Sequence, residues 1–102
     1  MGTRLQLHEL LLSLLEDNQK AYFQPTNDIR MSYPCIVYER QDFYTAKADN
    51  RPYRHLTRYQ VTVIDRDPDS PILDKVAALQ YCELSRHYVA ENLNHDSFTL
   101  YF

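Results

Sequence analysis

The segment Thr57–Ser70 reads TRYQVTVIDRDPDS and contains the clearest strand of the chain, followed by the start of a helix. Apolar and polar residues alternate over Thr57–Asp65, which predicts a strand with one apolar face. The apolar face consists of Tyr59, Val61 and Val63. After a turn that holds two aspartates around a proline, Ser70 is expected as the N-cap of a helix and Pro71 as its first residue. This segment therefore predicts a protein that combines strands with helices.

The elements expected on either side of this segment complete an α+β fold. In chain order they are a helix ending at Asp17-Asn18, strands over Lys20–Gln24, Cys35–Arg40 and Thr57–Asp65, a helix from Pro71 to about Leu84, a strand over Arg86–Glu91, a turn over Asn92–Asp96 and a strand over Phe98–Phe102. The order α-β-β-β-α-β-β predicts a single, mostly antiparallel sheet with two packed helices. A chain of 102 residues is expected to form one domain over residues 1–102.

The long stretch between the second and third expected strands is a candidate contact region. No period is visible over Gln41–Leu56, and Asp49-Asn50-Arg51-Pro52 is a turn signal, so we expect a long hairpin or loop that projects past the sheet. Aromatic and arginine side chains are enriched at protein interfaces, which favours protein contact. Single-stranded nucleic acid is the alternative partner for basic residues among aromatics. The predicted contact residues are Phe43, Tyr44, Lys47, Arg51, Tyr53 and Arg54.

The first helix carries more leucine than one sheet can cover. Its apolar sector spans about 220° of the helix surface, whereas a core-facing helix needs only about 100°. The surplus needs a second layer of the domain or a neighbouring subunit, and the small size of the chain favours the neighbour. The core-facing stripe is predicted to be Leu7, Leu10, Leu11 and Leu14, and the predicted oligomer interface is Leu5, His8, Leu12 and Leu15.

The composition excludes several classes of protein. The chain has a single glycine, Gly2, so it contains neither a P-loop nor the glycine-rich motif of dinucleotide-binding proteins. With 11 basic and 14 acidic residues it lacks the positive excess expected of a nucleic-acid-binding domain. The longest apolar run, Leu10-Leu11-Leu12, is too short for a transmembrane span, and we expect no signal peptide and no membrane partner.

No residue set predicts catalysis, a cofactor or a metal. Asp65, Asp67 and Asp69 alternate like the start of a calcium loop, but Ser70 and Val76 stand where that loop needs glycine and glutamate. The four histidines form no close pair of metal ligands, and Cys35 and Cys82 have no neighbouring ligand. We expect both cysteines to be buried thiols in a reducing compartment. The prediction is a protein without enzymatic activity.

Three stretches together resemble the tail-terminator, or tail-to-head joining, proteins of long-tailed bacteriophages. They are YPCIVYER (Tyr33–Arg40), RYQVTVIDRDPDS (Arg58–Ser70) and RHYVAENLNHDSFTLYF (Arg86–Phe102). The resemblance spans nearly the whole chain and rests on the order of the elements and on general sequence texture, with no catalytic signature.

The resemblance implies a structural virion protein, assembled in the host cytoplasm and located at the tail–neck junction. Such subunits form a homohexameric ring that caps the tail tube and offers a docking face to the head–neck connector, without enzymatic activity or cofactor. The implied partners are copies of the chain itself, the tube protein and the connector protein, while DNA only passes through the lumen. The alternative is a small binding module that uses residues 42–58 to grip a peptide or single-stranded nucleic acid.

Overall fold

The computed structural model describes residues 3–25, 30–48, 51–79 and 81–102, with the backbone alone for 42–48 and 51–56. Its elements are α1 (Arg4–Ser13), β1 (Lys20–Phe23), β2 (Cys35–Ala48), β3 (Arg51–Asp65), α2 (Pro71–Ala77), β4 (Cys82–Ala90) and β5 (Leu93–Tyr101). The predicted α+β class and the order α-β-β-β-α-β-β are both confirmed.

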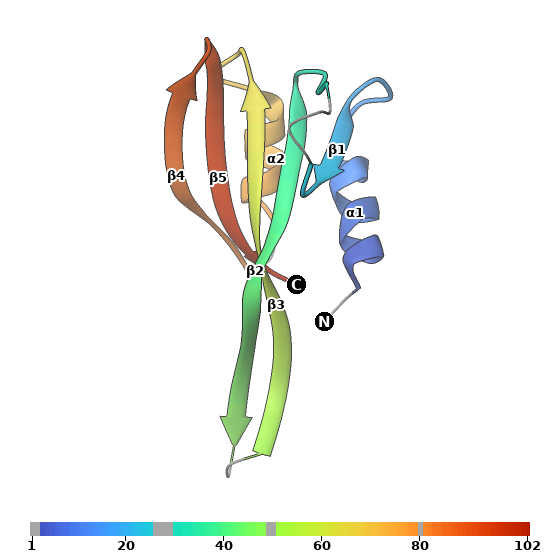
Figure 1. Ribbon diagram of the computed structural model, residues 1–102, viewed down its shortest axis with the longest axis vertical. Coiled ribbons are helices and arrows are strands. Elements are labelled where there is room, and N and C mark those ends of the chain that lie inside the picture. The colour runs from blue at the N-terminus through green and yellow to red at the C-terminus, as the bar shows by residue number, and fades with distance from the viewer. Residues whose placement is uncertain (1–2, 26–29, 49–50, 80) are drawn as a thin grey trace.

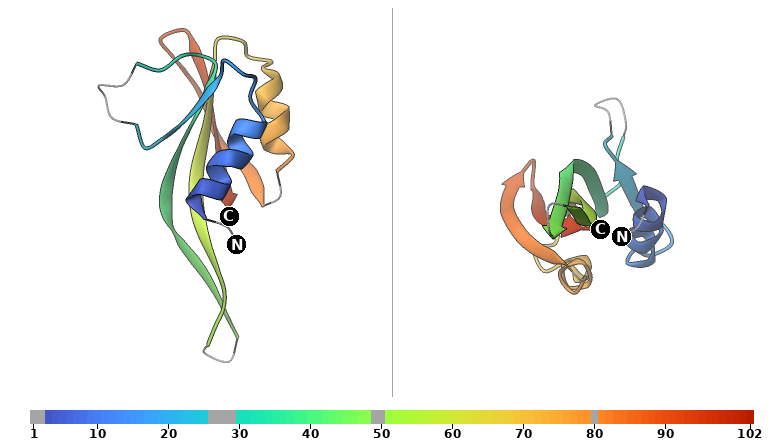
Figure 2. Two further views of the ribbon diagram at one scale, coloured as in Figure 1. Left: turned by 90° about the vertical axis from the view of Figure 1, so that its right-hand side faces the viewer. Right: turned by 90° about the horizontal axis from the view of Figure 1, so that it is seen from below.

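The five strands form one sheet in the order β1-β2-β3-β5-β4. The short β1 pairs with β2 in parallel, and the other neighbours are antiparallel, so the sheet is mostly antiparallel as predicted. Both helices lie on the same face of the sheet, with α1 beside β1 and α2 nearer β4 (Figures 1 and 2). The sheet therefore has a helix-covered face and a helix-free face, and β4 forms one of its two edges.

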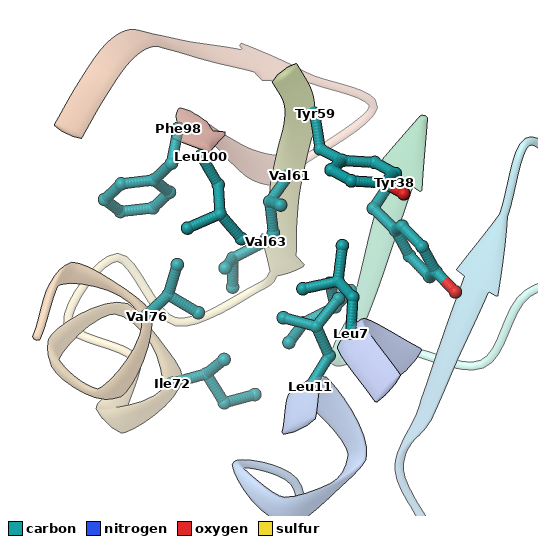
Figure 3. Packing of buried hydrophobic residues seen from close by; sticks show 11 residues of the cluster. Leu7, Leu11, Tyr38, Tyr59, Val61, Val63, Ile72, Val76, Phe98 and Leu100 are labelled. Carbon is teal, nitrogen blue, oxygen red and sulfur yellow. The ribbon is translucent and has the colours of Figure 1, made fainter. Parts of the chain in front are cut away.

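The main core lies between the helices and the central strands (Figure 3). The alternation predicted for β3 is confirmed, because its predicted apolar face is buried in this core. In the paired strand β5, Phe98 stands opposite Val61 and projects from the same face, and Leu100 stands opposite Tyr59. The buried residues of the cluster are Leu7, Leu11, Ile36, Tyr38, Tyr59, Val61, Val63, Ile72, Val76, Phe98 and Leu100.

The rotation of α1 about its axis is fixed by packing and by one hydrogen bond. Thr3 closes the N-terminus with a capping box, and Leu7 and Leu11 are fully buried against the sheet. His8, which follows Leu7 in the helix, forms a hydrogen bond with the buried hydroxyl of Tyr38, with 2.6 Å between His8 Nδ1 and that oxygen. Because three contacts on one side of a helix define its orientation, the opposite side of α1 must face away from this core.

The second helix ends earlier than the sequence predicts. Ser70 caps it and Pro71 opens it, as expected, but it stops at Ala77 and not near Leu84. The chain reverses at Tyr81, whose positive φ of 59° is incompatible with a continuing helix. Cys82–Leu84 therefore belongs to β4, because short apolar runs do not distinguish a helix from a strand.

The predicted turn over Asn92–Asp96 is also wrong. Only Glu91 and Asn92 connect β4 to β5, and both have positive φ, of 53° and 64°. Two consecutive residues of positive φ form the tight hairpin turn that matches the twist of the flanking strands. Asn94, His95 and Asp96 are consequently strand residues of β5 and not a loop.

Residues 41–56, in which the sequence shows no periodicity, belong to a long hairpin formed by β2 and β3. Its backbone pairs as far as Ala48 and Arg51, with register shifts between Arg40 and Asp42 and between Ala46 and Lys47. Asp49 and Asn50 of the predicted turn lie outside the described residues. The hairpin runs well beyond the rest of the sheet (Figure 1) and gives the molecule a longest dimension of 49 Å against 24 and 22 Å.

Two adjacent leucines of α1 provide a matched test of this packing. Leu11 is fully buried, so Leu11→Ala is expected to lower the free energy of unfolding by about 2–5 kcal/mol. Leu12 is exposed, so Leu12→Ala at low protein concentration is expected to change it by no more than about 0.5 kcal/mol. Urea denaturation followed by circular dichroism measures both values. Equal losses for the two variants would contradict the helix orientation described above.

Candidate interaction surfaces

The edge strand β4 is unusual because neither of its faces is covered. Eight of its nine residues, from Glu83 to Ala90, are exposed, although several are large and apolar. Register with β5 assigns each side chain to a face, since directly opposed residues project from the same side. Leu84 is opposite the core residue Phe98, and Val89 is opposite Asn94, so both project from the helix-covered face, and both remain exposed there.

We call the residues Leu84, His87 and Val89 the β4 patch. Leu84 is 59% exposed and Val89 is 62% exposed. Between them, His87 stands opposite Asp96, and its Nδ1 lies 2.7 Å from Asp96 Oδ1. Asp96 is almost buried, so the hydrogen bond holds the imidazole in place and leaves its Nε2 edge directed away from Asp96. The β4 patch thus combines two apolar side chains with a fixed imidazole.

A second uncovered surface is the outer side of α1, and we call Leu5, Glu9 and Leu12 the α1 outer stripe. Leu5 is 63% exposed, Leu12 is 41% exposed, and Glu9 is also exposed. Residues at i, i+4 and i+7 lie along one side of a helix, so the carboxylate stands between the two leucines. The α1 outer stripe and the β4 patch lie on opposite flanks of the molecule, as the positions of α1 and β4 in Figure 1 show.

The other two residues of the predicted oligomer interface have contacts within the chain. His8 is half-buried and hydrogen-bonds to Tyr38, and the partly buried Leu15 packs against the main core. Of the predicted inner stripe, Leu7 and Leu11 are buried, while Leu10 and Leu14 are partly buried against the same core. The outward exposure of the helix therefore concentrates on Leu5 and Leu12.

The predicted contact residues of the long stretch all lie on the hairpin of β2 and β3. Register places Phe43 opposite Thr57, Ala46 opposite Arg54 and Lys47 opposite Pro52. The side chains of Phe43, Tyr44, Lys47, Arg51, Tyr53 and Arg54 lie outside the described residues, so their role in protein contact stays a prediction.

The helix-free face of the sheet is polar at its centre. Thr62 and Ser97 are opposite each other on β3 and β5, and their hydroxyl oxygens are 3.0 Å apart. Gln60 donates to Ser97 Oγ and accepts from Gln41, which extends the hydrogen-bonded row along the face. Nearer the edge, the Tyr88 ring stacks on His95 at 4.6 Å. This face therefore offers hydroxyl and amide groups at its centre, beside a smaller apolar cluster of Cys35, Ile64 and Leu93.

The two thiols are free, and their chemistry is that of structural cysteines. Cys35 is buried as predicted, and burial, followed by the charge of Asp65, raises its pKa to about 12. Cys82 is only partly buried, and burial, followed by the charge of Glu83, raises its pKa to about 11. It lines a hollow of about 290 Å³ together with Tyr81, Glu83 and Tyr101. Neither thiol has the depressed pKa of a catalytic nucleophile.

Within the described part of the chain, no three His, Cys, Asp or Glu side chains are grouped so that they could hold a metal ion. The Asp65–Asp69 segment forms successive Asx turns instead, because the Asp65 carboxylate accepts from the Asp67 amide and the Asp67 carboxylate accepts from the Asp69 amide. Among the same residues, neither helix is long and apolar enough to cross a membrane.

No protein-family model matches the chain, and no curated protein matches it significantly.

Sequence reasoning found the leucine excess of α1 but missed the β4 patch. The sequence predicts a helix as far as about Leu84 and a strand over Arg86–Glu91, and it does not indicate where that strand lies in the sheet. A strand becomes an edge only through the sheet order, which is a tertiary property. Leu84 and Val89 are also five residues apart, so plain alternation would place them on opposite faces, and only the bulge between Leu84 and Arg86 brings them to the same face.

The raised pKa values lead to a prediction about thiol reactivity. A thiolate is the reacting species, so in the folded protein at pH 8 both thiols are expected to react with a disulfide reagent more slowly than a free cysteine peptide. Cys35 should react only after urea unfolds the chain, whereas Cys82 should react first. The variants Cys35→Ser and Cys82→Ser assign the two phases. Rapid reaction of Cys35 in the native protein would contradict its burial.

Proposed function

We propose that this chain is a ring-forming structural subunit of a phage tail, which caps the tail tube and joins the tail to the head–neck connector. The proposal rests first on the resemblance to tail-terminator proteins carried by Tyr33–Arg40, Arg58–Ser70 and Arg86–Phe102. Its main structural support is the pair of unlike apolar surfaces, the α1 outer stripe and the β4 patch, on opposite flanks of one protomer.

Two different surfaces on one chain favour a head-to-tail arrangement of copies. In a head-to-tail contact, each copy uses one surface toward its left neighbour and the other toward its right neighbour, and the series closes into a ring when the rotation permits. A dimer in which each copy uses the same patch would employ a single self-complementary surface. Most of the large apolar side chains that are exposed in the described residues, namely Leu5, Leu12, Leu84 and Val89, lie on these two surfaces, and clustered exposed apolar residues favour contact with a partner.

The hairpin supplies a part that such a ring needs for contact with other proteins. It extends along the long axis of the molecule, away from the strands that carry the β4 patch (Figure 1). An arm in this position leaves both flanks free for copies of the chain. The predicted contact residues at positions 43–54 lie along it. We therefore assign the hairpin to contact with the tube or the connector, and the flanks to self-assembly.

Sedimentation velocity over a range of protein concentrations tests self-assembly, and a complementation assay with tails that lack this protein tests joining. The expected result is a concentration-dependent shift from monomer to a ring, of six copies if the resemblance extends to the ring size, together with restored joining of tails to heads. A chain that remains monomeric at every concentration and restores no joining contradicts the proposal.

A shortened hairpin separates the two assigned roles. Replacing residues 45–55 by Asn-Gly joins Tyr44 to Leu56, its partner in register, through a favoured two-residue turn. This variant is expected to fold and self-associate like the wild type, but to lose the joining of tails to heads.

A shortened variant that joins tails normally would contradict the role assigned to the hairpin. The alternative, a module that binds single-stranded nucleic acid, is tested by titrating both proteins with a fluorescent oligonucleotide at two salt concentrations. Tight, salt-sensitive binding that the shortened variant loses would support that alternative against the structural role.

A further inference from the structure

We infer that the α1 outer stripe of one copy docks on the β4 patch of the next copy, with Glu9 facing His87 across the contact. This inference rests on the proposed function, because it names the surfaces through which the proposed assembly forms. Both surfaces are exposed in the protomer: α2 contacts β4, yet every residue of β4 after Cys82 stays exposed, and so does the outer side of α1.

The order of groups along the two surfaces is the same. The α1 outer stripe presents leucine, carboxylate and leucine at Leu5, Glu9 and Leu12. The β4 patch presents leucine, imidazole and valine. When the two are laid along each other, apolar groups meet apolar groups at both ends and the carboxylate meets the imidazole in the middle.

The spacing of the groups is also compatible. Leu5 and Leu12 are seven residues apart, which corresponds to about 10 Å along a helix axis. Leu84 and Val89 stand opposite Phe98 and Asn94, so they are separated by four residues of β5, or about 13 Å. His87, opposite Asp96, lies midway between them. A modest tilt of the helix against the strand brings both apolar ends into contact.

The charges favour Glu9 of the neighbouring copy as the partner of His87. His87 Nδ1 is held by the Asp96 carboxylate, so its other nitrogen is the one that can meet a neighbouring group. An imidazole that carries a proton on each nitrogen donates one to Asp96 and one to the Glu9 carboxylate of the next copy. A hydrogen bond to a charged acceptor is stronger than a neutral one, and it fixes the register of the contact.

The bulge in β4 indicates that the contact uses side chains rather than the strand backbone. The register shifts between Leu84 and Arg86, which leaves Ser85 as the extra residue, and its hydroxyl donates to the Ser97 carbonyl. A bulge in an edge strand twists the edge and opposes the addition of a further strand. The apolar side chains on the face of β4 remain available for a helix.

Mixing two assembly-defective variants tests the docking directly. Leu12→Glu damages the α1 outer stripe and leaves the β4 patch intact, and Val89→Glu does the reverse. Each variant alone is expected to associate at least about tenfold more weakly than the wild type, because a buried apolar side chain is replaced by a charge. A mixture in equal amounts is expected to form a heterodimer through the one contact that remains intact, as measured by sedimentation velocity.

Matched controls keep the test independent of folding. Gln6→Glu adds a negative charge to α1 beside Leu5 but about 100° further round the helix, and glutamate at this position retains the capping box. Ala90→Glu adds the charge beside Val89 on the helix-free face. Both controls should assemble like the wild type. Circular dichroism must show native spectra for all four variants, and Leu5→Glu and Leu84→Glu replace any variant that fails to fold.

The outcomes separate this inference from the proposed function. Assembly that survives either damaging variant, or a mixture of folded variants that forms no heterodimer, overturns the docking of the α1 outer stripe on the β4 patch and leaves the ring proposal standing. A wild-type chain that never self-associates overturns this inference, and if it also restores no joining of tails to heads it overturns the proposed function.

Discussion

The orientation of α1 is the constraint on which the surfaces of this protein depend. Leu7 and Leu11 are enclosed by the sheet, and the hydrogen bond between His8 and Tyr38 adds a directional contact on the same side. A helix fixed in this way cannot rotate to hide its remaining leucines, because exposing the inner pair would lose the burial of two complete side chains. The exposure of Leu5 and Leu12 thus follows from the way Leu7 and Leu11 pack in the core.

A second consequence follows from the order of the strands. The two helices pack on the central strands, and β4 lies at the edge of the sheet beside β5, where its residues after Cys82 stay exposed although α2 contacts the strand. Each flank of the molecule therefore ends in an uncovered apolar element, a helix side at one flank and a strand face at the other. The helix-free face, with its polar row around Ser97 and a small apolar cluster around Ile64, and the projecting hairpin complete a subunit whose sides differ in chemistry. Such differences between sides are what directional assembly requires.

The sequence predicted the elements that depend on local signals and failed where tertiary structure decides. Alternation in β3, the Ser70-Pro71 helix start and the leucine stripe of α1 were sufficient for the fold class. The predicted end of α2 and the predicted turn over Asn92–Asp96 were wrong. Both depend on positive φ values at Tyr81, Glu91 and Asn92, and because none of these residues is glycine, the composition gives little sign of them. The β4 patch could not be predicted at all, since only the sheet order makes β4 an edge.

Hydroxyl-radical footprinting over a range of protein concentrations measures most directly whether copies of the chain cover these surfaces. The account predicts that labelling of Leu5, Leu12, Leu84 and Val89 falls together as the concentration rises, while labelling of the exposed Tyr81 changes little. Labelling of the four residues that stays constant while the chain assembles, or that falls on only one of the two flanks, would contradict it.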